Sequence, residues 1–189
     1  HKYAVDNYGT VTIKNGTIEA RGVQNFGTLV IEEGVVIKAL DSNGGACVWN
    51  ENGTLVINGG TFSAPASNTE TSGAALVANT NGKVVINGGT FTTQSRVYAI
   101  NNYSGEIEIN GGNFTGARGV LAVSAGKATV NGGSFNLPAD AAAYCVYSNN
   151  GAVTIKGGTF NGGAHTYCVE STGKGTITLA DGTVLSAGN

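Results

Sequence analysis

The sequence has few charged residues and almost no proline. Asp, Glu, Lys and Arg make up 12% of the 189 residues, proline occurs twice and methionine not at all, whereas glycine occurs 31 times. The net charge of -2 comes with no basic cluster, so the electrostatic attraction that nucleic acids and anionic membranes require is missing. This composition also disfavours helices and offers many positions where a chain can turn. We therefore expect an ordered chain of strands and tight turns that binds no nucleic acid.

Long hydrophobic runs and metal-ligand motifs are also missing. No apolar run approaches the roughly 20 residues that span a bilayer, which predicts no membrane insertion. The three cysteines, Cys47, Cys145 and Cys168, make no zinc spacing with His1 or His165, so we expect no metal and no cofactor. The chain opens with HKYAVDNYGT, without Met or a signal-peptide layout, which predicts a mature or excised piece of a longer protein.

One phrase, in contrast, is repeated along the whole chain. A glycine followed by alternating apolar residues opens eight units, which recur about every 24 residues. The units are GTVTIKNGTI from Gly9, GTLVIEEGVV from Gly27, GTLVINGGTF from Gly53, GKVVINGGTF from Gly82, GEIEINGGNF from Gly105, GKATVNGGSF from Gly126, GAVTIKGGTF from Gly151 and GTITLADGTV from Gly175. Because variable stretches separate a constant phrase, we expect variable loops on a constant scaffold.

Within each unit the apolar residues have a period of two. Leu55 and Ile57, for example, alternate with polar or smaller residues, as in a short strand with one buried face. The Asn-Gly-Gly that follows predicts a corner in which Asn and Gly adopt positive φ. A second strand then returns a large apolar side chain to the core, and a third strand precedes each glycine, as in CVWN and YCVYS. The large apolar residue is Phe62, Phe91, Phe114, Phe135 or Phe160.

Three short strands per unit predict an all-β fold, namely a single-stranded parallel β-helix with three sides and about eight coils. Such coils stack about 4.8 Å apart and hydrogen-bond to one another. The Asn or Ser that ends the third strand should form a column that bonds neighbouring turns. Its members are Asn7, Asn25, Asn50, Asn79, Asn102, Ser148 and Ser171. We expect residues 1–189 to form one β-helix domain.

The three-strand unit, the Asn or Ser column and the repeated Phe and Ile positions resemble the right-handed parallel β-helix of the pectin-lyase-like superfamily. The NGGTF-type phrase is similar to repeats of large secreted or surface-attached bacterial proteins. The resemblance covers essentially the whole chain, and it implies right-handed coils and a secreted or cell-surface location. It selects no function, because lyases, hydrolases, adhesins, tailspikes and carbohydrate-binding modules share the fold.

The carboxylates form no obvious catalytic pair. An enzyme resembling the lyases or hydrolases of this superfamily would need carboxylates on adjacent coils, roughly 5 to 9.5 Å apart. The aspartates fall in different units: Asp6, Asp41, Asp140 and Asp181. Glu106 and Glu108 alternate on one strand and should point to solvent. We therefore predict that the chain is not an enzyme, with a polysaccharide lyase or glycoside hydrolase as the alternative.

Aromatic and basic side chains are the best candidates for recognition. Trp49, the only tryptophan, and Tyr147 occupy a variable position that we expect to face outward, where a ring stacks on a sugar or anchors a protein partner. Arg96 and Arg118, with His165 two coils later, fall on the edge with the longest connections, where the arginines would grip a carboxylate or sulfate group. The alternatives stay open: a Trp49 half covered by the preceding connection, and ordinary surface arginines.

Two of the cysteines fall at equivalent positions. Cys145 and Cys168 lie at the same position of adjacent units, which puts their Cα atoms about 5 Å apart and within disulfide range. Ala4, Leu76 and Ala99 hold that position elsewhere, so a stack of small apolar residues with free thiols is the other interpretation.

Together these features predict a non-catalytic, adhesin-like module of a secreted or cell-surface bacterial protein, which binds a polysaccharide or a host glycoprotein. A purely structural stalk is a further alternative, because stacked coils supply stiffness without recognition. Exposed strand edges at the two ends of the stack also predict end-to-end self-association.

Overall fold

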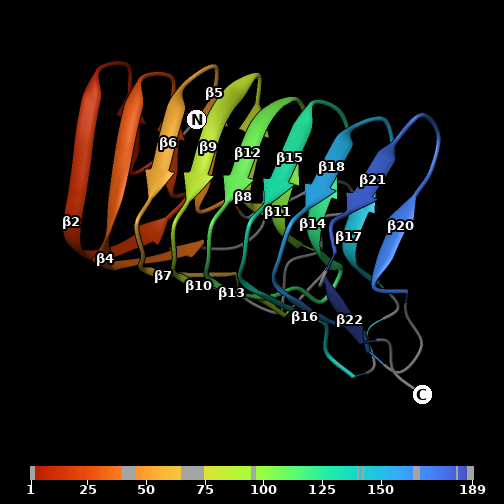
Figure 1. Ribbon diagram of the computed structural model, residues 1–189. Coiled ribbons are helices and arrows are strands. Elements are labelled where there is room, and N and C mark those ends of the chain that lie inside the picture. Colours follow the sequence, from red (N-terminus) through yellow and green to blue (C-terminus); the bar gives the residue numbers. More distant parts are fainter. Residues whose placement is uncertain are drawn as a thin grey trace.

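The protein is built from parallel strands that stack along one long axis (Figure 1). The computed structural model describes residues 3–39, 46–64, 75–94, 97–139, 141, 143–163, 167–181 and 183–186. In these segments every paired strand runs parallel to its neighbour and helices are absent. It follows that the described part holds no helix capable of crossing a membrane. The fold is all-β, with parallel strands in stacked sheets, as in a β-helix or solenoid.

One side of the stack is an eight-stranded sheet, which we call sheet A. In spatial order its strands are β1 (Val5–Asn7), β3 (Val23–Asn25), β5 (Val48–Glu51), β8 (Ala75–Thr80), β11 (Tyr98–Asn102), β14 (Gly119–Val123), β17 (Tyr144–Ser148) and β20 (Val169–Ser171). Each strand therefore pairs with the equivalent strand of the next repeat unit, not with its neighbour in the sequence.

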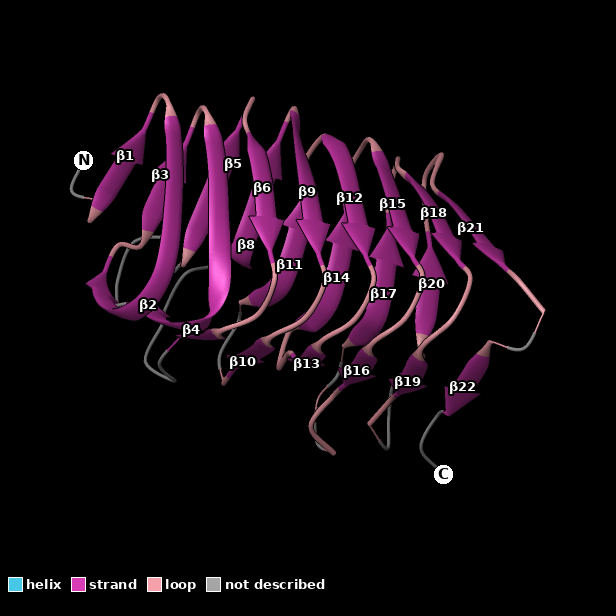
Figure 2. Ribbon diagram, turned by 60° about the vertical axis from the view of Figure 1, so that its left-hand side comes forward, coloured by secondary structure: helices cyan, strands magenta, loops and turns pink. Residues whose placement is uncertain are grey.

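The remaining strands form a 14-stranded sheet with two ladders, B and C. The long strands β2 (Thr10–Ala20) and β4 (Thr28–Ala39) run through both ladders and bend between them (Figure 2). Ladder B continues with β6 (Thr54–Ile57), β9 (Gly82–Ile86), β12 (Gly105–Ile109), β15 (Lys127–Val130), β18 (Ala152–Ile155) and β21 (Thr176–Leu179). Ladder C continues with β7 (Thr61–Ala64), β10 (Thr90–Thr93), β13 (Asn113–Thr115), β16 (Ser134–Asn136), β19 (Thr159–Asn161) and β22 (Val184–Ser186).

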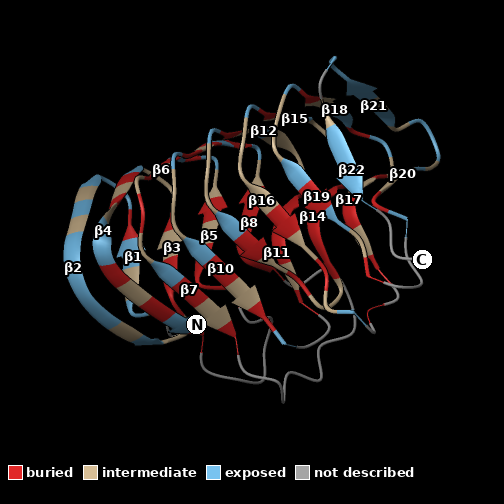
Figure 3. Ribbon diagram, turned by 60° about the horizontal axis from the view of Figure 1, so that its bottom comes forward, coloured by how far each residue is buried: buried red, intermediate tan, exposed pale blue. Residues whose placement is uncertain are grey.

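The core follows the period of two in the sequence. In β6, Leu55 and Ile57 are fully buried while Thr54 is exposed, and buried and solvent-facing segments alternate throughout the stack (Figure 3). Apolar side chains recur at the same place in successive strands, so they form columns that fill the interior. The phenyl rings of the NGGTF phrases stack with centroids 4.5 to 4.9 Å apart. This confirms the predicted alternation and the return of Phe to the core.

The Asn-Gly-Gly phrase forms the corner between ladders B and C, but only its second glycine adopts positive φ. These glycines have φ between 101° and 114°: Gly60, Gly89, Gly112, Gly133 and, in the phrase Lys-Gly-Gly that takes the same place in its unit, Gly158. The first glycine is needed for space, since a Cβ on Gly157 would lie 2.6 Å from the carbonyl oxygen of Asn131. The prediction of positive φ at the asparagine was wrong. Its side chain instead reaches along the stack, where Asn87 Nδ2 donates to Asn58 Oδ1 at 2.9 Å.

A buried asparagine column runs along the corner between sheet A and ladder B, as predicted for its first five members. Each Nδ2 donates to the next Oδ1 at 2.6 to 2.9 Å, through Asn7, Asn25, Asn50, Asn79 and Asn102. Val123 then interrupts the column, because it lies in register between Asn102 and Ser148. The two serines bond within their own turns, Ser148 to Gly151 O and Ser171 to Gly175 O. The prediction for the serines was wrong because their side chains are too short to bridge the strand spacing of about 4.8 Å.

The three cysteines are buried and have free thiols. Val146 pairs with Val169, which puts Cys145 and Cys168 side by side as predicted. Their thiols point to backbone carbonyls, and Cys168 Sγ donates to Ser186 O at 2.9 Å. Burial raises the pKa of Cys47 and of Cys145 to about 12, so both thiols stay protonated. The stack of small apolar residues is the interpretation that the structure supports.

Candidate binding surface

Aromatic side chains gather on the outward side of sheet A, on its strands or directly beside them. The sequence contains seven tyrosines and one tryptophan; six of these eight residues lie between β5 and β20, whereas Tyr3 and Tyr8 flank β1 at the N-terminal end of the sheet. The six are Trp49, Tyr98, Tyr103, Tyr144, Tyr147 and Tyr167, and we call them the aromatic face. All six are exposed or half-buried, whereas the phenylalanines of the NGGTF phrases fill the core.

Trp49 stacks on Tyr103 across the intervening strand β8. The ring centroids are 6.2 Å apart and the planes are inclined by 14°. The register places Ala78 between Trp49 and Asn101, and this small residue leaves room for the two rings. Ala78 and Asn101 occupy the row that was predicted to face outward, but in the middle of the sheet both are buried. Trp49 itself is half-buried, and its buried Nε1 has no hydrogen-bond partner. It packs against the protein and offers only part of its ring.

The ring of Tyr98 contacts two consecutive residues of the next unit, Arg118 and Gly119. A Cβ on Gly119 would come within 2.7 Å of Tyr98 Cε1, so glycine lets the ring lie flat against the next strand. The guanidinium of Arg118 covers the ring, with its Cζ 5.0 Å from the centroid. Burial raises the pKa of Tyr103, while a hydrogen bond with Asn101 and the nearby charge of Arg118 lower it. Arg118 therefore belongs to the same cluster as Tyr98 and Tyr103.

A second cluster lies on β17 and β20. The rings of Tyr144 and Tyr147 stack with centroids 5.6 Å apart, and the Tyr147 hydroxyl is 2.9 Å from Thr172 Oγ1. The hydrogen bond to Glu170 is the main reason that the pKa of Tyr144 rises to about 12, with burial and the Glu170 charge adding to it. Tyr167 lies beside this pair with 74% of its side chain exposed. The cluster combines flat rings with a carboxylate and a hydroxyl group.

The structure places three of the five predicted binding residues on the same side of the stack, in two clusters. Trp49, Tyr147 and Arg118 all lie on the aromatic face. Arg118 directly precedes β14. Because its guanidinium covers the ring of Tyr98, Arg118 belongs to the aromatic cluster and not to a separate row of basic residues. Arg96 and His165 lie outside the described residues.

The sequence interpretation missed Tyr98, Tyr103, Tyr144, Tyr167 and Glu170. A signal for three of them was present, since a tyrosine opens the third-strand phrases YAINN, YCVYS and YCVES. The first residue of these phrases lies on the surface, outside the alternation that predicts the strands.

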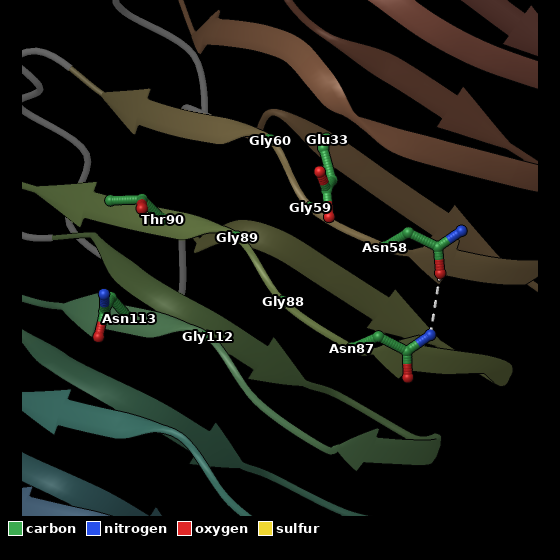
Figure 4. Close-up of a pocket in the computed structure, with 10 residues that line it drawn as sticks. All are labelled: Glu33, Asn58, Gly59, Gly60, Asn87, Gly88, Gly89, Thr90, Gly112 and Asn113. Atoms are coloured by element: carbon green, nitrogen blue, oxygen red, sulfur yellow. Dashed lines mark hydrogen bonds between the residues drawn. The ribbon is translucent and has the colours of Figure 1, made fainter.

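A shallow polar groove runs along the Asn-Gly-Gly corners. Its volume is about 520 Å³, and it is lined by the Asn, Gly and Thr residues of three successive corners with Glu33 at one end. Figure 4 shows Asn58 and Asn87 on successive corners, joined by a hydrogen bond, with bare glycine backbone beside them. The amide chain continues through Asn110 and Asn131 at 2.9 and 2.8 Å. The phrase is a corner, as predicted, and this exposed amide chain was not foreseen.

Protein-family models, curated proteins and solved structures give no significant match to the chain. Functional inference therefore starts from the chemistry of these surfaces.

The described carboxylates lie mainly on charged, solvated surface. Glu106 is exposed on β12 and stands in register between Lys83 and Lys127. Glu108 accepts a hydrogen bond from Asn131 Nδ2 at 3.2 Å. Within the described segments, no three His, Cys, Asp or Glu residues are grouped so as to hold a metal ion. Of the four aspartates, Asp6 and Asp181 are exposed, and two lie outside the described residues: Asp41 and Asp140.

Proposed function

We propose that the chain is a non-catalytic, adhesin-like β-helix module that binds a polysaccharide or a glycoprotein through its aromatic face. The observation that carries this proposal is the gathering of six aromatic side chains along one side of the stack. A rigid β-stack holds such rings in fixed positions, which reduces the entropy lost when a ligand binds.

The cluster on β17 and β20 has the chemistry that sugar recognition requires. Aromatic rings offer flat apolar faces to the C–H groups of a sugar, and neighbouring polar groups fix its orientation. The exposed ring of Tyr167 supplies such a face. Glu170 uses one hydrogen bond for Tyr144, which leaves further lone pairs of its carboxylate for sugar hydroxyls. Arg118, in the cluster with Tyr98, would favour an acidic sugar. Arg96 and His165 are proposed for the same role from the sequence alone.

The finer description of the fold belongs to the same proposal. A three-sided β-helix with about eight coils is supported by the eight strands of sheet A and by the eight repeat units. The right-handedness and the secreted or cell-surface location rest on the resemblance to the pectin-lyase-like superfamily. The aromatic face supports a recognition role over that of a purely structural stalk.

The experiment is a binding screen of the purified chain against plant, microbial and mucin glycans, with a product assay in parallel. Saturable binding without new reducing or unsaturated ends is expected. Release of such ends would favour the polysaccharide lyase or glycoside hydrolase alternative. Absence of binding to every glycan and glycoprotein would favour a structural stalk.

A further inference from the structure

The outward side of ladder C is uncharged from β7 to β19. Two rows of side chains face solvent there, and every member is Ser, Thr or Asn and is exposed or half-buried. The first row is Thr61, Thr90, Asn113, Ser134 and Thr159, and the second is Ser63, Thr92, Thr115, Asn136 and Asn161. We call these ten residues the uncharged face.

The other outward sides of the stack carry charge. Lys83, Glu106 and Lys127 stand in one row on ladder B. On ladder C itself, the ion pair of Lys38 with Glu19, at 2.6 Å, lies just before the first strand of the uncharged face. Five successive strands without an ionisable outward side chain select a neutral partner, because an unpaired charge on the partner would lose its hydration without compensation.

The uncharged face has a regular geometry. Its two rows are in register, so neighbouring groups lie about 4.8 Å apart across strands and about 6.6 Å apart along a strand. Threonine is stiff at χ1, and internal hydrogen bonds hold other members in place. Asn161 Nδ2 donates to Asn136 Oδ1 at 2.7 Å, and Asn136 Nδ2 donates to Ser134 Oγ at 3.0 Å. The exposed amide chain of the corner groove runs alongside as a third row (Figure 4).

A small soluble sugar would gain little on this surface. One hydroxyl contact that replaces a contact with water contributes only about 0.5 to 1.5 kcal/mol. A flexible oligosaccharide also loses conformational freedom when it is ordered, which offsets several such contacts. Most of the face is open: the corner groove runs along one side, and a second hollow of about 510 Å³ borders only Thr92 and Thr115 of its ten residues, so a small ligand would contact few of them. A partner whose hydroxyl groups are already ordered loses far less freedom and makes many contacts at once.

We propose that the uncharged face binds the ordered surface of an insoluble, neutral polysaccharide, with the Ser, Thr and Asn side chains matching its repeating hydroxyl groups. This site goes beyond the proposed function of the aromatic face and stands independently of it, because the two surfaces lie on different sheets and share no residue.

The test is a depletion assay in which the chain is mixed with microcrystalline cellulose or chitin powder and the unbound fraction is measured. Soluble oligosaccharides of the same sugars serve as competitors, and the salt concentration is raised from ~0.05 M to ~1 M. We expect retention by the powder, no competition by the oligosaccharides and no loss at high salt. Failure of both powders to retain the chain would overturn the proposal, as would full competition by short oligosaccharides.

Substitutions on and away from the uncharged face test whether this face causes the retention. The double substitution Thr92→Lys and Thr115→Lys places two charges on half-buried positions of the face, and we expect it to weaken retention by about tenfold. Thr54→Lys adds a charge at an exposed threonine on ladder B and should leave retention unchanged. Thr90→Lys, at an exposed position of the same face, should also weaken retention, which separates loss of the surface from misfolding of the double variant. Loss of retention in Tyr167→Ala, or in Thr54→Lys, would overturn the assignment. Adsorption to ice crystals in place of the powders would contradict it as well.

Discussion

The phenyl rings of Phe62 and Phe91 stack with centroids 4.5 Å apart and planes inclined by only 4°. Their strands, β7 and β10, pair in register, so the two phrases INGGTF place identical side chains directly above one another. The same relation continues to Phe114, Phe135 and Phe160. A repeated phrase in the sequence thus becomes a continuous column in the core, and each member supports the two beside it.

Removing the middle ring should destabilise the fold strongly. Phe114→Ala leaves a cavity between two buried rings, and we expect the free energy of unfolding to fall by about 3 to 5 kcal/mol. Phe114→Leu, which keeps most of the volume, should cost clearly less. Urea denaturation monitored by circular dichroism measures both. Equal losses in the two variants would contradict a role for the stacked column.

The buried asparagine column should matter more than the exposed one. Asn79 donates to Asn102 Oδ1 and Gly82 O and accepts from Asn50, all in the interior. Asn79→Ala leaves these groups unpaired, and we expect a loss of about 3 kcal/mol in the free energy of unfolding. Asn131→Ala, in the exposed amide chain, should cost less than about 0.5 kcal/mol. Similar losses for the two variants in urea denaturation would show that burial is not the deciding factor.

Features that depend on residues within one repeat unit could be predicted from the sequence, whereas features that depend on contacts between units could not. The alternation around Leu55 and Ile57 is local, so strands and corners followed directly from the repeat. The third-strand phrase VLAVS, at residues 120–124, has no asparagine to mark its register. The structure shows that Val123 pairs with Asn102. The aromatic face depends on contacts between units, such as the ring of Tyr98 over Gly119, which no single phrase contains.

The hydrogen bond between Glu170 and Tyr144 predicts a measurable change in titration. It is the largest of the causes that raise the pKa of Tyr144 from 10.0 to about 12, ahead of burial and the charge of Glu170. Because the folded-state pKa is the higher one, this interaction stabilises the fold fully below pH 10 and loses its effect as the pH rises through about 12. Glu170→Gln should therefore shift one tyrosine toward a lower pKa and weaken the fall in stability over that window. Ultraviolet titration of tyrosinate measures this, and an unchanged profile would contradict the assignment.

The last strands should promote end-to-end association of this chain. Leu179, Val184 and Leu185 expose 45%, 54% and 39% of their side chains on β21 and β22, whose outer edges are unpaired among the described residues. We expect the sedimentation coefficient to rise with concentration and Val184→Lys to reduce that rise. Thr54→Lys adds the same charge in the middle of the stack and serves as the control. A concentration-independent monomer would contradict the prediction.

The most direct test of the aromatic face compares two tyrosines of nearly equal exposure. Tyr167 lies at the C-terminal end of sheet A, within the aromatic face, and is 74% exposed, whereas Tyr8 follows β1 at the opposite end of the sheet, stacks on Phe26 and is 75% exposed. The measurement is the affinity of Tyr167→Ala and Tyr8→Ala for the best glycan from the binding screen, by isothermal titration calorimetry. We predict a loss of about tenfold for Tyr167→Ala and none for Tyr8→Ala, since only the first removes a stacking ring from the site. Equal affinities for the two variants would contradict recognition by the aromatic face.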